Sequence, residues 1–237
     1  MVTVTPALSL RTYYQNVFSF LSFDTRQGSK PGQDIRNFLN LCIWNNCLLQ
    51  LQVLDLEGVY KPKLPKDIAK LSGLRYLGLR WTYLESLPSS ISSLLQLQTL
   101  DLKHTYIQTL PSSIWKMKLR HLFLSESNRT RFPSKPIGID IGRSLHDHQT
   151  LWGVFVDEET PVKSGLDKLV NITKLGITGQ SQVSAVADWI VKLQYLQSLR
   201  LKSRDKQGRP SKIHLKFLQH HTNLTDLYLL TCICWDA

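Results

Sequence analysis

The sequence lacks the features that mark several large classes of protein. It has only four cysteines in 237 residues, Cys42, Cys47, Cys232 and Cys234, which are too few for a disulfide scaffold. No histidine completes a zinc-ligand spacing around them, so we expect reduced thiols and no bound metal. No apolar run reaches about 18 residues, which predicts no insertion into a membrane. The first residues also show no secretory signal pattern.

Motifs for catalysis and cofactor binding are missing as well. The sequence contains no G-x-S-x-G nucleophile elbow and no G-x-x-x-x-G-K-[ST] phosphate-binding loop. His121 and His148 have no nearby Cys, Asp or Glu in a catalytic or metal-binding pattern. We therefore expect neither an enzyme nor a cofactor.

Acidic residues are scarce relative to basic ones. The chain has 29 Lys and Arg against 18 Asp and Glu, a formal net charge of +11. This balance permits nucleic acid, an anionic membrane surface or an acidic protein as a partner, without choosing among them. The basic residues gather in tracts 116–135 and 192–216, which fall on different faces of a repeat and match no nucleic-acid-binding fold. We expect no specific nucleic-acid partner.

What the sequence has in abundance is a leucine repeat. The pattern L-x-x-L-x-L begins at residues 51, 74, 97 and 119, in steps of 23, 23 and 22, and weaker copies begin at 172, 196 and 224. We expect degenerate copies at Phe18-Leu21-Phe23 and at His148-Leu151-Gly153. A period of about 20–29 residues with this core is typical of leucine-rich repeats. It predicts an α/β fold, a curved leucine-rich repeat solenoid with a parallel sheet on its concave face.

A second pattern repeats in phase with the first. Leu64-Pro65, Leu87-Pro88 and Leu110-Pro111 each open a short segment, and proline is tolerated in the first turn of a helix. We expect short helical or 3₁₀ return arms here. Trp81, Trp115 and Trp189 fall in turns or arms, where we expect them to pack against the leucines.

These patterns predict the organisation of the chain. We assign residues 1–17 to an N-terminal flank, the tail of a missing upstream region, and residues 18–237 to the repeat domain. Repeats are regular over 51–124 and irregular over 125–237. Three turn-rich tracts, 24–37, 125–150 and 203–212, are interpreted as loops. The chain stops within a repeat, at TCICWDA, which we interpret as truncation at the C-terminus.

The strand pattern also predicts a binding face. Residues between the core leucines alternate with them, so the third, fifth and seventh positions of L-x-x-L-x-L-x are expected to line the concave sheet. Exposed aromatic residues beside arginine are the usual composition of a protein interface. The candidate protein-binding residues are Tyr76, Arg80, Asp101, Lys103, His121, Phe123, Trp152, Lys174, Arg200, Lys202 and Tyr228.

The central repeats resemble those of one particular family. The motif L-x-L-x-x-T-x-[LI]-x-x-L-P occurs at Leu79–Pro88 and Leu102–Pro111, with Thr82 in the polar turn of the first copy and Thr105 in that of the second. It resembles the leucine-rich repeats of plant intracellular nucleotide-binding disease-resistance proteins. The segments YYQNVFSFLSFD and HQTLWGVFVDE are similar to segments of such proteins as well, except that His148 replaces the expected leucine.

The resemblance implies a recognition module of a plant innate-immune receptor. Its partners would be a pathogen effector or a guarded host protein, and the NB-ARC domain, which the repeats would restrain in cis or in trans. That domain is absent from this chain, and its acidic back would account for the basic charge. Three N-glycosylation sequons occur without a signal peptide, so a cytoplasmic location is expected. The alternatives are a generic scaffold or substrate adaptor in intracellular signalling, and a non-functional receptor fragment.

Overall fold

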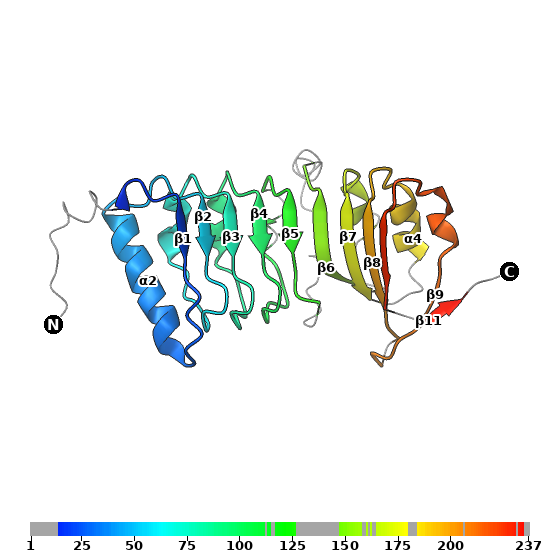
Figure 1. Ribbon diagram of the computed structural model, residues 1–237, viewed down its shortest axis with the longest axis horizontal. Coiled ribbons are helices and arrows are strands. Elements are labelled where there is room, and N and C mark those ends of the chain that lie inside the picture. The colour runs from blue at the N-terminus through cyan, green and yellow to red at the C-terminus, as the bar shows by residue number, and fades with distance from the viewer. Residues whose placement is uncertain are drawn as a thin grey trace.

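The computed structural model forms one long parallel sheet (Figure 1). It describes residues 14–111, 113–114, 117–126, 147–157, 160, 162, 165–179, 184–205, 207–230 and 232–234. Nine strands lie side by side in the order β1-β2-β3-β4-β5-β6-β7-β8-β10, and all pairs are parallel. This is the predicted curved solenoid, with the sheet on its concave face and short arms that return behind it.

The elements follow one another in repeating order. The strands of the large sheet are β1 (Ser19–Leu21), β2 (Val53–Asp55), β3 (Tyr76–Gly78), β4 (Thr99–Asp101), β5 (His121–Phe123), β6 (Thr150–Val156), β7 (Lys174–Gly179), β8 (Ser198–Ser203) and β10 (Asp226–Leu229). A second sheet pairs β9 (Lys212–His214) with β11 (Cys232–Cys234). The helical segments are α2 (Ser29–Trp44), η1 (Lys66–Lys70), η2 (Ser89–Ser93), η4 (Leu166–Lys168), α4 (Ser184–Val191) and η5 (Lys216–His220).

One column of leucines sets the register of the sheet. The central leucine of each repeat lies opposite that of the next: Leu54, Leu77, Leu100, Leu122, Leu151, Leu175, Leu199 and Leu227. All except Leu227 are fully buried. Burying one leucine contributes about 1.5–3 kcal/mol, and a one-residue slip would expose the whole column. The column therefore fixes the strand pairing.

The return arms have the predicted 3₁₀ form. η1 and η2 begin after Pro65 and Pro88, which have extended backbone angles, and each arm buries one isoleucine, Ile68 or Ile91. A 3₁₀ helix rises about 2.0 Å per residue, against about 1.5 Å in an α-helix, so it spans a given distance with fewer residues, which suits a repeat of only 23 residues. The arms thus cover the back of the leucine column.

The threonines of the polar turns are buried and hydrogen-bonded. The Thr82 hydroxyl donates to the Leu79 carbonyl at 2.6 Å, and the Thr105 hydroxyl donates to the Leu102 carbonyl at 2.8 Å. Each bond satisfies a carbonyl that leaves the strand into a buried turn, where an unpaired carbonyl would be costly. The threonine of the L-x-L-x-x-T motif is therefore explained by this hydrogen bond.

Tract 24–37 was expected to be a loop, but its second half is helical. α2 packs against η1 at the N-terminal end of the sheet (Figure 1). Pro31 is the third helical residue, where no intrahelical N–H bond is needed. Ile35, Leu39 and Cys42 recur at a helical spacing and are buried. This apolar stripe outweighs the turn-forming residues at the start of the segment.

The first strand is shifted by one residue from the predicted pattern. Phe20, not Leu21, lies opposite the core residue Leu54. Because side chains alternate across a strand, the shift turns Leu21 to the side opposite Phe20, and Phe18, Leu21 and Phe23 are each about half exposed: 51, 52 and 56 %. Phe20 instead stacks on Phe38 of α2, with ring centroids 4.9 Å apart. The packing against α2 decides the register here.

The degenerate repeat at His148 contains a bulge. His148 is fully buried in the leucine position, and Leu151 takes the predicted core place. Between Trp152 and Val154 the pairing with β7 shifts, and Gly153 has φ 80°, which favours glycine. Val154 is therefore buried in the core, although the repeat spacing placed Gly153 there and Val154 on the concave face.

The third interpreted loop is a compact polar turn. The Asp205 carboxylate accepts hydrogen bonds from the backbone N–H groups of Gln207 and Arg209, and from Arg209 Nε at 2.8 Å. The backbone of Arg204 bridges to Pro210. Most of tract 125–150, and Trp115, lie outside the described residues. Within the described part of the chain, no helix is long and apolar enough to cross a membrane.

Candidate protein-binding face

The concave face receives its side chains from the third, fifth and seventh positions of successive strands. Of the eleven predicted residues, eight are half-buried, as expected for side chains standing on a sheet, two are exposed, and Asp101 is buried. Lys174 is exposed, and Tyr228 on the last strand is 52 % exposed. These side chains form one continuous surface because the strands that carry them are hydrogen-bonded neighbours.

At the N-terminal end of this face, charges are paired within the surface. Arg80 Nη2 lies 2.7 Å from Glu57 Oε2 and 3.7 Å from Asp55 Oδ2. Burial raises the pKa of Asp55, and Arg80 partly offsets the shift. Burial beside Asp55 raises the pKa of Tyr76 to about 12, so its hydroxyl stays protonated. At this end of the face, two carboxyl groups thus share one arginine.

Asp101 has a structural role rather than the expected exposed one. Its carboxylate accepts a hydrogen bond from the backbone N–H of Lys103 at 3.0 Å, and its residue is only 5 % exposed. Two repeats earlier, the Asp55 carboxylate accepts the equivalent bond from the backbone N–H of Glu57, at 3.2 Å. Aspartate often closes a turn in this way. The expectation that Asp101 is presented to a partner is therefore corrected.

Two cations lie over aromatic rings in the middle of the face. Lys103 Nζ is 4.3 Å from the centroid of the Phe123 ring, and Arg200 Cζ is 5.7 Å from that of Trp152. Arg200 Nη2 also contacts Glu126 Oε2 at 3.3 Å. Cation–π contacts hold both groups in place while part of each remains open to solvent. The strands β4 to β8 thus present ordered aromatic and basic side chains.

His121 stands between these pairs and is uncharged at neutral pH. Its Nδ1 lies 3.1 Å from Thr150 Oγ1. Burial lowers the pKa of His121, and the positive charges of Arg120 and Lys174 lower it further. No acidic group completes a catalytic arrangement in these contacts.

The described residues offer no arrangement suited to a metal ion. Among them, no three His, Cys, Asp or Glu side chains come together. Cys42 and Cys47 are fully buried next to each other, and burial, with Cys47 nearby, raises the pKa of Cys42 to about 12. A thiol with this pKa stays protonated and is a poor ligand and nucleophile.

A family model described as a leucine-rich repeat region matches residues 38–236 of the chain. The chain belongs to the leucine-rich repeat family. Leucine-rich repeat domains are protein–protein interaction modules in general, and this chain has the family's open parallel sheet. No curated protein sequence matches it significantly.

Solved structures of leucine-rich repeat proteins share the fold. A leucine-rich repeat protein of Leptospira interrogans superposes with a TM-score of 0.59 at 20 % identity, over 94 % of this chain and 57 % of its own. Internalin C2 of Listeria monocytogenes superposes with a TM-score of 0.53 at 16 % identity, over 85 % of this chain and 91 % of its own. Internalin F of Listeria monocytogenes superposes with a TM-score of 0.54 at 16 % identity, over 83 % of this chain and 66 % of its own. The chain thus spans little more than half of the Leptospira protein.

Sequence reasoning missed a row of aromatic residues beside the concave face of this leucine-rich repeat domain. Tyr60, Tyr83 and Tyr106 recur at intervals of 23 residues, and their rings contact one another in sequence. Trp81, expected to pack against the leucines, is 52 % exposed and stacks on His104; Trp189 is buried as expected. The equal spacing of the tyrosines was a signal available in the sequence.

Proposed function

We propose that the chain recognises a protein partner with the concave face from β4 to β10, as the sensing part of a plant intracellular immune receptor. The observation that carries the proposal is the pair of cation–aromatic contacts, Lys103 on Phe123 and Arg200 on Trp152. Tryptophan, tyrosine and arginine dominate the binding energy of protein interfaces. Rings and guanidinium groups held in place before binding lose less entropy when a partner arrives.

The basic side chains around these contacts indicate the character of the partner surface. Lys174 is exposed, and Lys202 and Arg200 stand half-buried on neighbouring strands. Arg200 is paired with Glu126, whereas no carboxylate is in ion-pair contact with Lys174 or Lys202 in the described part of the chain. An acidic patch on the partner would complement these lysines and raise the rate of association.

The assignment to plant immunity rests on the resemblance of the turn motif at Leu79–Pro88 and Leu102–Pro111. It supports a pathogen effector or a guarded host protein as the partner, an NB-ARC domain as the element restrained in cis or in trans, and the cytoplasm as the compartment. Partner binding would then shift a two-state equilibrium of the NB-ARC domain, with no chemical step.

Binding to purified proteins tests this proposal. The folded chain is immobilised and exposed to NB-ARC domains of plant receptors and to a panel of pathogen effectors, and binding is followed by interferometry. For any partner found, Lys202→Glu is compared with Lys192→Glu, which makes the same charge change on the exposed turn after α4. We expect the first variant to weaken binding by about tenfold or more, and the second to change it less than about twofold.

Two outcomes would contradict the proposal. The first is that the folded chain binds no NB-ARC domain and no effector. The second is that Lys202→Glu and Lys192→Glu weaken binding equally. Recovery of ubiquitin-ligase subunits instead would favour the adaptor function.

A further inference from the structure

A second surface lies outside the concave face, on the loops that follow the strands. We call Tyr60, Trp81, Tyr83, His104 and Tyr106 the aromatic row. The rings of Tyr60 and Tyr83 are 5.4 Å apart between centroids, and so are those of Tyr83 and Tyr106. Trp81 and His104 stack at 3.7 Å with an interplanar angle of 12°. The tyrosine rings therefore run across three successive repeats, and the Trp81–His104 pair spans two of them.

The backbone does not require these ring-bearing residues. Trp81, Tyr83 and His104 have φ of 60°, 55° and 56°, in the left-handed region, where bulky side chains are uncommon. Gly58 fills the place of Trp81 one repeat earlier with φ 76°. Left-handed non-glycine residues concentrate at binding sites, because the strain persists only where something outweighs it. Fold stability does not supply a reason, since Trp81, Tyr83 and Tyr106 are 52, 44 and 50 % exposed.

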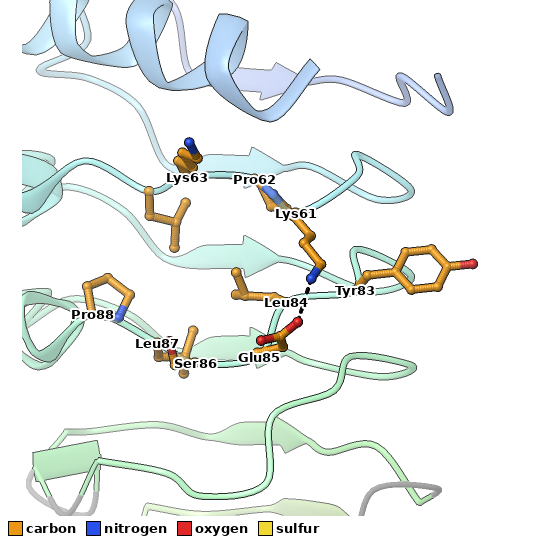
Figure 2. A pocket seen from close by; sticks show the side chains of 10 residues that line it. Lys61, Pro62, Lys63, Tyr83, Leu84, Glu85, Ser86, Leu87 and Pro88 are labelled. Atoms are coloured by element: carbon orange, nitrogen blue, oxygen red, sulfur yellow. Dashed lines mark hydrogen bonds and ion pairs between the residues drawn. The ribbon is translucent and has the colours of Figure 1, made fainter. Parts of the chain in front are cut away.

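A pocket of about 350 Å³ borders the row between two consecutive loops (Figure 2). Segments 61–64 and 83–88 line it, and they contribute apolar surface from Pro62, Leu84 and Leu87. An ion pair between Lys61 Nζ and Glu85 Oε1, 2.5 Å long, ties the two loops together. Figure 2 shows the Tyr83 side chain extending outward from its loop beside this pair. Tyr83 belongs to both the row and the lining of the pocket, and so joins the two.

The contacts of the loops exclude several kinds of ligand. The backbone N–H groups of Gly58, Lys61 and Trp81 donate to carbonyls of the following repeat at 2.7–3.0 Å, so no strand can be added there. The tyrosine rings are tilted by only 34–41° to their neighbours, so they do not surround a point as a cage for an ammonium ion would. Lys61 and Arg80, at the flanks of the row, are paired with carboxylates, which leaves little local charge to select an ion.

A proline-rich segment fits what remains. A polyproline II helix has no internal hydrogen bonds, presents flat pyrrolidine rings, and docks in aromatic-lined grooves with little loss of entropy. Two steps of 5.4 Å place the outer tyrosine rings no more than about 11 Å apart, close to the roughly 9 Å of one polyproline turn. Each tyrosine also carries a hydroxyl, which can donate a hydrogen bond to a carbonyl of such a segment.

We propose that the aromatic row binds a proline-rich segment of a partner protein in the polyproline II conformation. The site is independent of the concave face, and neither proposal depends on the other. The proline rings lie against the outer surface of the aromatic row, and the pocket beside Tyr83 receives the residue that follows.

Fluorescence anisotropy with a labelled peptide tests the proposal. The probe is a 12-residue peptide with the pattern P-x-x-P throughout, and its control has every proline replaced by alanine. We expect saturable binding of the probe, with at least about tenfold weaker binding of the control. Tyr83→Ala in the full chain should weaken binding of the probe by about tenfold or more, since an anchor ring is lost.

Matched variants separate this result from loss of fold and from the concave face. Tyr195→Ala removes a ring of 58 % exposure outside the row, and it should leave the probe affinity unchanged. Lys202→Glu on the concave face should do the same. The proposal is overturned if the alanine peptide binds equally well, if Tyr83→Ala binds like the wild type, or if the folded chain binds an oligosaccharide array but no proline peptide.

Discussion

The repeats from β2 to β5 and those from β6 to β10 use one leucine column in different ways. In the first group, three-residue strands alternate with tight loops and, where described, with 3₁₀ arms. In the second, strands β6, β7 and β8 have six or seven residues, β6 has a bulge, and the helix α4 replaces a 3₁₀ arm. The column runs through both, so the inward leucines tolerate large changes in the elements around them.

The difference shows which parts of the fold can be predicted from the sequence pattern. In the first group, core, turn and arm all repeat with the same period, so each repeat supports the interpretation of the next. In the second group only the core leucines repeat, and the turns and arms are set by local contacts. The candidate binding side chains follow the same division, with the aromatic row in the first group and most of the basic candidate residues of the concave face in the second.

The largest effect is expected from the leucine column itself. Leu100→Ala, in a fully buried position, should lower the free energy of unfolding by about 2–5 kcal/mol. Leu227→Ala, the equivalent position in β10, should cost less than about 1 kcal/mol, because Leu227 is 42 % exposed. Chemical denaturation of both variants measures the difference. Equal losses would show that the column is equally packed to its end.

The bulge in β6 should be sensitive to a single methyl group. Gly153→Ala should destabilise by about 1–3 kcal/mol, because φ is 80° and the new Cβ would clash with the Leu124 carbonyl oxygen. Gly28→Ala is the control, since φ is also positive there, at 98°, but nothing lies within 4 Å of the added Cβ. Thermal unfolding should show a larger loss for Gly153→Ala. A similar loss in both would mean that only the backbone angle matters.

The buried threonine hydroxyls of the first group should contribute a smaller amount. Thr82→Val removes the bond to the Leu79 carbonyl and should cost about 1–2 kcal/mol in urea denaturation. Valine fits the space, because Val59 occupies the equivalent place one repeat earlier and is fully buried. Unchanged stability would mean that the carbonyl finds another donor.

The smallest effect is the pH dependence due to His121. Its pKa is lowered by burial below the ordinary 6.5, so the unfolded chain binds the proton more readily than the folded one. The free energy of unfolding should therefore fall as the pH drops below about 6.5, and the loss should be complete below the folded-state pKa. His121→Gln should reduce this slope in denaturation curves measured between pH 7.5 and about 5. An unchanged slope would assign it to other groups.

Much of the fold could be predicted from the sequence, because the same core, turn and arm residues recur in successive repeats. The leucine column, the 3₁₀ arms after Pro65 and Pro88, and the turn at Thr82 were all expected. The register of β1 was not expected, because it depends on the packing of Phe20 against Phe38 of α2, a helix that does not belong to the repeat pattern. The bulge at Gly153 was missed because an inserted residue changes the alternation without changing the residue types.

The strand positions of the candidate binding residues were predicted from alternation, whereas binding by these residues stays a prediction. Alternation placed Trp152, Arg200 and Lys202 on the concave side, where they lie. It could not distinguish Asp101, whose carboxylate closes its own turn, from a side chain open to solvent. Nor did it place Trp81 outside the core, although its stacking partner His104 follows it at the repeat spacing of 23 residues.

Hydroxyl-radical footprinting of the chain with a bound effector or NB-ARC domain tests the central claim most directly. The proposal of concave-face recognition predicts that Trp152, Phe123 and Tyr228 become protected on binding, while Trp44 and Tyr195, 76 and 58 % exposed outside that face, keep their oxidation rates. Protection of Trp44 or Tyr195 with unchanged oxidation of Trp152, Phe123 and Tyr228 would contradict it.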